Sequence, residues 1–422
     1  MNDETRLDRR LPQVLADLGA GRSPDYTESI LARTAATRQR PGWVFPERWL
    51  PMSALTQRMT AVPRLSWRAV AVIALIVLAL ASAALYAGSR QRHLPTPFGP
   101  AANGGIPYVS GGDVFVGDPV TGKTRLLIGG PEADAYPQFS PDGTHVAFIR
   151  DVGDATVKPV DIYVVQDDGS DLRKITPEPL RDVASISWTP DSRGIAVVSS
   201  LDAATSKLDV YDSAGTGSIR TIATVPGMDF VQFRPPAGDA LLYRVNDRGA
   251  AGLYAMDADG SHVRPLVLSS HPGDNDYWGG ATWSADGSRI FYTRPFAQPT
   301  STGACCSLWV TNADGSDPRE FIPNDGTAWD GQPTVSPDGK MVAFWNGHVS
   351  VVRVDGTGPV IQTGPELQGT RHWVWSPDSS KILMIPDDGG TQAYLLDPNG
   401  GPWTTVPWNS ETDLDWQRVA GD

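Results

Sequence analysis

Cysteine and histidine are scarce in this chain, which has two cysteines and six histidines among 422 residues. It contains no Cys-x-x-Cys pair and no His-Glu-x-x-His sequence, two patterns in which these residues hold zinc. A Gly-x-Ser-x-Gly nucleophile elbow is also missing, and few residues follow Trp416 for a hydrolase domain. We therefore predict no catalytic residues, no metal, no cofactor and no enzyme activity.

Long apolar runs are absent, with one exception at residues 69–88. These residues carry no charge and are bounded by Arg68 and Arg90. At about 1.5 Å per residue, a helix of this length spans about 30 Å, the thickness of a bilayer core. A cleaved signal peptide would begin much nearer the N-terminus. We predict a transmembrane helix over residues 68–89.

The charge is unevenly distributed along the chain. Residues 1–68 contain eleven arginines and seven acids, whereas the whole chain carries a net charge of −13. The excess of arginine before the span favours a cytoplasmic N-terminus, with the C-terminal part outside the membrane. The C-terminal part is acidic and repels phosphate backbones, so we expect no nucleic acid partner for it.

The cytoplasmic segment, residues 1–67, is predicted to be α-helical over 5–19 and 24–38. Its layout, short helices followed by one span, is similar to that of membrane-bound anti-sigma factors. The segment lacks the cysteine of their zinc signature. A cytoplasmic regulator that binds residues 1–67 is therefore a second hypothesis. Residues 90–105 are rich in proline and glycine and are expected to form a linker.

A short phrase recurs through the rest of the chain, residues 106–422. It opens on an aromatic or apolar residue and continues as Ser-Pro-Asp-Gly or a close variant. The openings are Phe139, Trp188, Phe233, Trp283, Val335, Trp375 and Trp416. They are 49, 45, 50, 52, 40 and 41 residues apart, and such a period with four short strands is typical of a β-propeller blade.

Each part of the phrase has a physical role. The opening residue ends an inner strand and packs between blades, and Pro-Asp-Gly forms a tight turn. An Asp-Gly hairpin then joins the third strand to the fourth, as at Asp168 and Asp314. Residues 106–128 supply three strands and residues 412–417 supply one, so together they complete a seventh blade. We predict an all-β, seven-bladed propeller closed by strands from both ends of the domain.

The repeats resemble the WD40-like (PD40) repeats of TolB-type propellers. The phrases FSPDG and VAFIRD at 139–151, and WSADGSRIFYTR at 283–294, carry the resemblance, which covers residues 106–417. It implies an extracytoplasmic propeller that binds a protein or a small ligand in the cell envelope. The predicted anchor departs from soluble TolB-type proteins, so their partners are not carried over. Related propellers also cap prolyl-oligopeptidase-like hydrolases.

The two cysteines, Cys305 and Cys306, are adjacent and precede a predicted third strand. Outside the membrane, thiols tend to oxidise. Neighbouring side chains on a strand point to opposite faces, so a bond between them requires a distorted peptide. Three states remain open: a vicinal disulfide, two free thiols or intermolecular bridges.

Candidate binding residues lie in the loops that link one blade to the next, because propellers usually bind ligands at that mouth of the central tunnel. Carboxylates next to aromatic rings, with one Arg-His pair, are suited to grip a sugar, a peptide or a cation. The candidates are Asp134, Tyr136, Asp229, Asp276, Trp278, Trp329, Asp330, Arg371, His372 and Asp413. The alternative is that these residues only pack and solvate the rim.

Three functions are compatible with the sequence. The first is a non-enzymatic, membrane-anchored module that binds or senses a ligand outside the membrane. The second is a transmembrane regulator that uses the propeller as its sensor. The third, which the missing motifs disfavour, is a propeller hydrolase or lyase.

Overall fold

The computed structural model describes most of the propeller and one short stretch before it. The described residues are 71–78, 95–153, 159–202, 204–247, 249–269, 280–295, 306–323, 331–366, 370–386, 391–412 and 414–421. The chain divides into two compact units, residues 1–91 and residues 92–422. We describe each unit by itself.

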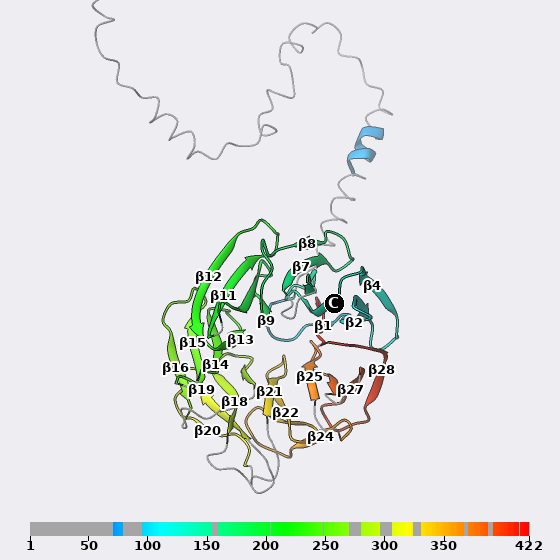
Figure 1. Ribbon diagram of the computed structural model, residues 1–422. Helices are drawn as coiled ribbons and strands as arrows, with labels where there is room; N and C mark the ends of the chain where they lie inside the picture. Colours follow the sequence, from blue (N-terminus) through cyan, green and yellow to red (C-terminus); the bar gives the residue numbers. More distant parts are fainter. Residues whose placement is uncertain are drawn as a thin grey trace, which may run out of the picture. The chain divides into compact units, whose positions relative to one another are not determined.

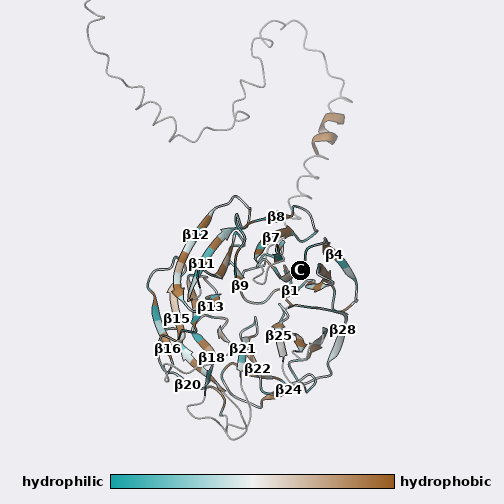
Figure 2. Cartoon of the chain, in the orientation of Figure 1, coloured by the Kyte–Doolittle hydropathy of each residue, from teal (hydrophilic) through white to brown (hydrophobic). Residues whose placement is uncertain are grey.

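In the first unit, residues 71–78 are helical and their side chains are largely exposed. They belong to the predicted span and are apolar (Figure 2). Among the residues that the structure describes, no helix is both long enough and apolar enough to cross a membrane. The remainder of the predicted span, 68–70 and 79–89, lies outside the described residues, as do the predicted helices 5–19 and 24–38.

The second unit is a seven-bladed β-propeller. Within the described residues, six blades are four-stranded sheets whose strands follow chain order, and one is three-stranded. The three-stranded sheet contains β2 (Ile106–Ser110), β3 (Asp113–Gly117) and β4 (Thr124–Ile128). Figure 1 shows strands such as β9, β21 and β25 nearest the centre of the ring and β12, β16 and β28 at its periphery.

The four-stranded sheets each begin with an inner strand and end with an outer one. The first three sheets are formed by β5 (Asp134–Phe139), β6 (His145–Asp151), β7 (Val160–Gln166) and β8 (Arg173–Lys174); β9 (Val183–Trp188), β10 (Gly194–Ser200), β11 (Thr205–Asp212) and β12 (Ile219–Pro226); and β13 (Met228–Phe233), β14 (Ala240–Val245), β15 (Gly252–Asp257) and β16 (Arg264–Leu268). The next three are formed by β17 (Ala281–Trp283), β18 (Arg289–Pro295), β19 (Cys306–Asn312) and β20 (Arg319–Glu320); β21 (Gly331–Val335), β22 (Met341–Trp345), β23 (Val349–Arg353) and β24 (Ile361–Thr363); and β25 (Thr370–Trp375), β26 (Ile382–Pro386), β27 (Gln392–Leu396) and β28 (Thr404–Asn409).

The ring is closed by both ends of the propeller, as predicted, but not by the predicted strand. Residues 414–417 form no strand, and the closing ladder is β1 (Ala102–Asn103) with β29 (Arg418–Val419). The C-terminal segment still runs beside β2, because the Glu411 N–H donates to Val109 O at 2.9 Å and the Gln417 N–H to Gly105 O at 2.9 Å. A ladder forms only where both backbones remain aligned. Regular strand pairing of the C-terminal segment therefore begins at Arg418, after the predicted strand 412–417.

The apolar core lies between blades rather than within them. Buried apolar side chains form clusters, each shared by two neighbouring sheets. The repeat aromatics Trp188, Trp375 and Trp416 are at most 7% exposed and belong to these clusters. The indole N–H of Trp188 donates to Gln138 O on the preceding blade at 3.2 Å, and that of Trp375 to Thr334 O at 3.3 Å. The repeat aromatic therefore joins blades through both its ring and its N–H.

The Ser-Pro-Asp turn has one hydrogen-bond pattern in several blades of the ring. In the repeat that begins at Val335, the buried Ser336 Oγ–H donates to Asp338 Oδ1 at 2.7 Å and accepts from the Met341 N–H at 3.0 Å. Asp338 Oδ1 also accepts from the Lys340 N–H at 3.1 Å. The turns at Ser140, Ser284 and Ser376 repeat these contacts.

Two repeats carry serine where three others carry Gly143, Gly287 and Gly339, and both serines contact the preceding blade. Ser192 and Ser379 have φ of 59° and 65°, a conformation that costs a non-glycine residue about 1 kcal/mol. Their hydroxyls accept from the Asp142 N–H at 3.2 Å and the Asp338 N–H at 3.0 Å. These hydrogen bonds between blades offset the backbone cost.

Replacing Ser336 by alanine tests the turn pattern. The variant leaves the Met341 N–H and the Asp338 carboxylate short of a partner, so we expect the free energy of unfolding to fall by about 1–3 kcal/mol. Chemical denaturation followed by tryptophan fluorescence measures this change. Ser110, exposed at the end of β2, is the control, and Ser110→Ala should leave stability within about 0.5 kcal/mol of the wild type. Equal effects of the two substitutions would contradict a structural role for the turn.

Candidate functional site

The inner strands surround a cavity of about 800 Å³ at the centre of the ring. In the four-stranded blades, the inner strand starts at the loop from the preceding blade and ends at the Ser-Pro-Asp turn or its counterpart. We call the two ends of the channel the link face and the turn face accordingly. The described lining comes from β5, β9, β13 and β25, from the C-terminal segment 414–418 and from Pro97.

The inner strands bring polar side chains to the cavity beside the repeat aromatics. Gln138, Ser187 and Gln232 precede these aromatics in consecutive blades, and Asp415 precedes Trp416. Successive residues of a strand point to opposite faces of its sheet, and the Gln232 Oε1 accepts from the Trp283 N–H of the next blade at 3.2 Å. Most of the lining residues are apolar, and the amide and hydroxyl groups among them can donate and accept hydrogen bonds.

Asp415 and Arg418 bring opposite charges to the channel lining. Asp415 Oδ2 accepts from the Phe139 N–H at 2.7 Å. Burial raises the pKa of Asp415 to about 6, against hydrogen bonds from the Trp416 and Phe139 N–H groups and the attraction of Arg418. Burial lowers the pKa of Arg418, and Asp415 opposes that shift. The Arg418 Nε is buried and has no hydrogen-bond partner among the described residues.

Two of the predicted site residues, Tyr136 and His372, line the same cavity. Both lie three residues before a repeat aromatic, nearer the link face. Tyr136 is 46% exposed and has φ of 52°, at a bulge in β5 that turns its ring away from the regular ladder. The structure thus places this aromatic ring and this imidazole at the cavity, on the inner strands β5 and β25 rather than in the loops between blades.

Asp134 and Asp229 do not line the described cavity and are instead paired within their own blades. The buried Asp134 accepts two hydrogen bonds from Arg150, at 2.6 and 2.8 Å. Asp229 accepts two from Arg244, at 2.8 and 2.9 Å. Each bidentate ion pair joins the inner strand of a blade to the second strand of the same blade. For these two residues this contact is structural, in line with the alternative that the candidates only pack and solvate the rim.

The remaining predicted site residues cannot be placed. Asp276, Trp278, Trp329, Asp330 and Asp413 lie outside the described residues. For Arg371, the structure describes the backbone in β25 but not the side chain.

Cys306 begins β19, is fully buried and is disulfide-bonded. The chain contains one other cysteine, its neighbour Cys305, which lies outside the described residues.

One sequence pattern was overlooked. Residues 117–124 read GDPVTGKT, which matches the phosphate-binding pattern Gly-x-x-x-x-Gly-Lys-Thr. The structure places it in the hairpin between β3 and β4, where Asp118 Oδ1 accepts from the Val120 and Thr121 N–H groups at 2.8 and 3.0 Å. A phosphate loop requires a following helix whose N-terminal N–H groups face the ligand, whereas here a strand follows.

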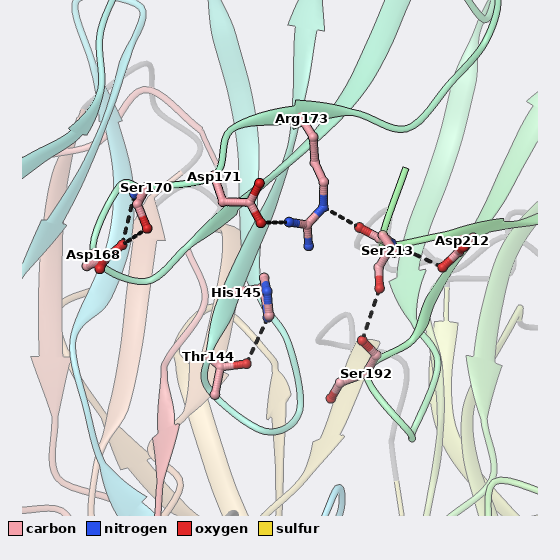
Figure 3. Close-up of polar contacts among 10 residues, drawn as sticks. Thr144, His145, Asp168, Ser170, Asp171, Arg173, Ser192, Asp212 and Ser213 are labelled. Carbon is pink, nitrogen blue, oxygen red and sulfur yellow. Dashed lines mark hydrogen bonds and ion pairs between the residues drawn. The ribbon is translucent and has the colours of Figure 1, made fainter. Parts of the chain in front are cut away.

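A polar cluster joins the first two four-stranded blades outside the channel (Figure 3). Arg173 Nε donates to Ser213 O at 2.7 Å, and its Nη1 pairs with Asp171. Burial, followed by the charge of Arg173, lowers the pKa of His145 in the same region. The contacts of the polar cluster hold these neighbouring blades together.

A second cavity, of about 510 Å³, lies between β9–β12 and β13–β16.

Sequence reasoning missed most of the channel wall. Ser185, Ser187, Gln138, Gln232 and Asp415 were not among the candidates, although each occupies a fixed offset before a repeat aromatic. The sequence alone shows that offset, so it could have identified these residues. Within the described residues, no group of three or more His, Cys, Asp or Glu side chains is arranged to hold a metal ion.

Comparisons with known proteins identify the fold. No protein-family model matches the chain. A tricorn protease homologue of Streptomyces coelicolor is 30% identical over 137 residues, which cover 27% of this chain and 11% of that protein. This chain thus spans about a tenth of the length of that relative.

Solved structures also share the propeller fold. An oligogalacturonate lyase in complex with manganese matches 74% of this chain and 86% of its own, with a TM-score of 0.52 and 14% identity. A prolyl endopeptidase matches 74% of this chain and 51% of its own, with a TM-score of 0.52 and 14% identity. TolB from Acinetobacter baumannii matches 74% and 82%, with a TM-score of 0.47 and 16% identity. At such identities the likeness shows the fold alone.

The raised pKa of Asp415 predicts a pH-dependent gain in stability for Asp415→Asn. Because the folded-state pKa of about 6 is above the ordinary value of 3.8, the stability of the wild type falls as the pH rises through that window. The asparagine side chain would keep an oxygen for the Phe139 N–H without the buried charge. We expect the variant to be more stable by up to about 3 kcal/mol at pH 7.5 and the gain to disappear near pH 4.

Asp338→Asn is the matched control, measured by denaturation at the same two pH values. Burial raises the pKa of Asp338, but hydrogen bonds from Ser336 and Lys340 outweigh this effect and leave it below its ordinary value. Its carboxylate therefore stabilises the fold at pH 7.5, and this contribution is lost as the pH falls through the lowered pKa. The control should destabilise the protein at pH 7.5. A destabilising effect of Asp415→Asn at pH 7.5 would contradict the burial argument.

Proposed function

We propose that this protein is a membrane-anchored binding module whose propeller receives a ligand or a partner's loop in its central channel, outside the membrane. The observation that carries the proposal is the channel itself, about 800 Å³ in volume, in which a few polar side chains stand among apolar and aromatic ones. Ligand sites are commonly concave, with a few convergent polar groups among apolar and aromatic ones. Gln138, Ser185 and Ser187 supply polar groups, while Tyr136 and Phe230 supply aromatic rings.

The charges in the channel favour a ligand with little net charge. Asp415 and Arg418 contribute one acidic and one basic group, so a strongly charged ligand would meet repulsion as well as attraction. The Arg418 Nε–H, buried without a partner among the described residues, is a donor that a ligand oxygen would satisfy. A neutral polyhydroxylated ligand or an uncharged peptide loop fits this set of groups.

The membrane anchor and the location outside the membrane belong to the same proposal. They rest on the uncharged run 69–88 and on the arginine-rich segment before it. The described part of that run, residues 71–78, is helical and apolar, which supports a helical anchor.

A transmembrane regulator is the second candidate, and one observation favours it. Residues 95–103, which follow the predicted span, lie against the turn face of the channel and pair with β29. A ligand in the channel and the segment leading to the membrane thus contact the same residue, Arg418. In this version of the proposal, residues 1–67 would hold a cytoplasmic regulator.

The predicted orientation is tested by protease accessibility in intact cells stripped of any outer barrier. With an epitope tag at each end, external protease should remove the C-terminal tag and leave the N-terminal tag intact, because only the propeller is outside. Detergent lysis, the control, should expose both tags. Protection of both tags in intact cells would contradict the predicted topology.

The channel is tested by filling it. Ser185 is half-buried in β9 and lines the cavity, so Ser185→Trp should block binding without removing a structural contact. The full-length protein is cross-linked in cells and its bound material is identified by mass spectrometry. We expect at least a tenfold loss of specific ligand with Ser185→Trp, whereas Val120→Trp, at a site that is 86% exposed, should retain it.

A third variant in the same cross-linking experiment separates the anchored binding module from the transmembrane regulator. A chain lacking residues 1–66 keeps the span and the propeller. A cytoplasmic protein that is lost on this truncation would support the regulator, whereas bound material that is unchanged would support the anchored binding module alone. Equal recovery with Ser185→Trp and with the wild type would contradict channel binding in both versions.

A further inference from the structure

The segment before β1 crosses the turn face of the channel as a strap that bends at residues 97–99, where Gly99 has φ of 80°. We use this name for residues 95–101, which contain Pro95, Pro97 and Pro100 and no charged side chain. Pro97 lines the central cavity. At its C-terminal end the Ala101 N–H donates to Pro377 O at 3.0 Å, in the Ser-Pro-Asp turn after β25. The sequence predicted a linker here, but the strap is in contact with the propeller.

Phe98 anchors the strap in apolar surroundings. Its half-buried ring packs against the core cluster shared by β9–β12 and β13–β16, which includes Met228, Val231 and Phe233. This cluster lies in an interface different from the one that contains Pro377. The strap therefore bridges two separate parts of the ring, with its aromatic residue at one end and its backbone at the other.

Arg418 holds the middle of the strap through backbone carbonyls. Its Nη2 donates to Gly99 O at 2.6 Å and to Thr96 O at 3.1 Å. A guanidinium only donates hydrogen bonds, and a proline-rich segment offers carbonyl oxygens with few N–H groups. The chemistry of Arg418 is thus matched to the carbonyls of a bent, proline-containing backbone rather than to particular side chains.

These contacts have the properties of a peptide-binding site. Proline-containing segments are recognised through exposed carbonyls and an aromatic or proline anchor, and each proline ring fixes one backbone angle before binding. Outside its end at β1, the strap belongs to no β-ladder, and Thr96 and Pro100 are exposed. A competing peptide therefore has to replace one aromatic contact and a few hydrogen bonds.

We propose that the turn face of the channel is a binding site for a bent peptide with a phenylalanine flanked by prolines, and that the strap occupies this site in the chain itself. A partner segment of the same chemistry displaces the strap. This site lies at the turn face and shares Arg418 with the proposed channel site, but its test follows the strap itself and is separate from the test of a channel ligand.

The probe is a fluorescently labelled peptide with the sequence LPTPFGPAA, residues 94–102 of this chain. Its binding to the full-length protein is measured by fluorescence anisotropy. In the wild type the strap competes within the same molecule, so we expect weak binding. Phe98→Ala frees the strap but leaves Arg418, β1 and β29 in place, and we expect the peptide to bind this variant at least tenfold more tightly. The exposed Val120→Ala is the matched control and should behave as the wild type.

Two further measurements keep the proposal falsifiable. A peptide in which alanine replaces the phenylalanine should bind neither protein, since the aromatic anchor is lost. In the wild type, hydrogen exchange of the strap should accelerate at saturating peptide, which tests displacement even if Phe98→Ala fails to fold. Equal peptide affinity for Phe98→Ala and the wild type, binding that ignores the phenylalanine, or strap exchange unchanged by bound peptide would overturn the proposal.

Discussion

Closure of the ring is the constraint on which the rest of this structure depends. A line of seven blades would leave one blade at each end with an apolar face exposed and an unpaired sheet edge. The ladder between β1 and β29 and the cluster that joins β2 to the last blade remove both. Trp416 takes part twice, through its buried ring and through an indole N–H that donates to Gly104 O at 3.2 Å. The channel exists only because this closure holds the inner strands in a circle.

Contacts between blades and groups that line the cavity come from neighbouring residues of the same strands, and the C-terminal segment has both. The repeat aromatic is buried between blades, and the residue before it also lines the cavity in four of the repeats. Within four residues, Asp415 lines the channel, Trp416 fills an interface and Arg418 holds the strap. The buried charge of Asp415 lowers stability at neutral pH. A ligand that contacts Asp415 or Arg418 therefore acts on the residues that close the ring and hold the segment leading toward the predicted span.

The propeller could be predicted without the structure, because its evidence is local and repeated. A period of 40–52 residues, turn residues at fixed offsets and an aromatic at the end of each inner strand identify seven blades without knowledge of any long-range contact. The same register also contained the channel-facing residues, one position before each aromatic. Tyr136 and His372 were chosen as candidates because they stand beside blade-linking loops that the repeat makes recognisable.

The sequence does not reveal the tertiary contacts of its polar residues. These contacts decide which of the polar residues are available to a ligand. Asp134 and Asp229 resemble Tyr136 in their position along the repeat, but each is engaged by an arginine from the neighbouring strand. The strap likewise read as a linker, since its contacts include Arg418, which lies 319 residues from Gly99 along the chain. Composition and spacing describe neighbours along the chain. Ring closure and the position of the strap depend on residues that folding brings together from far apart along the chain, whereas each ion pair depends on the register of two adjacent strands, with partners 15 or 16 residues apart.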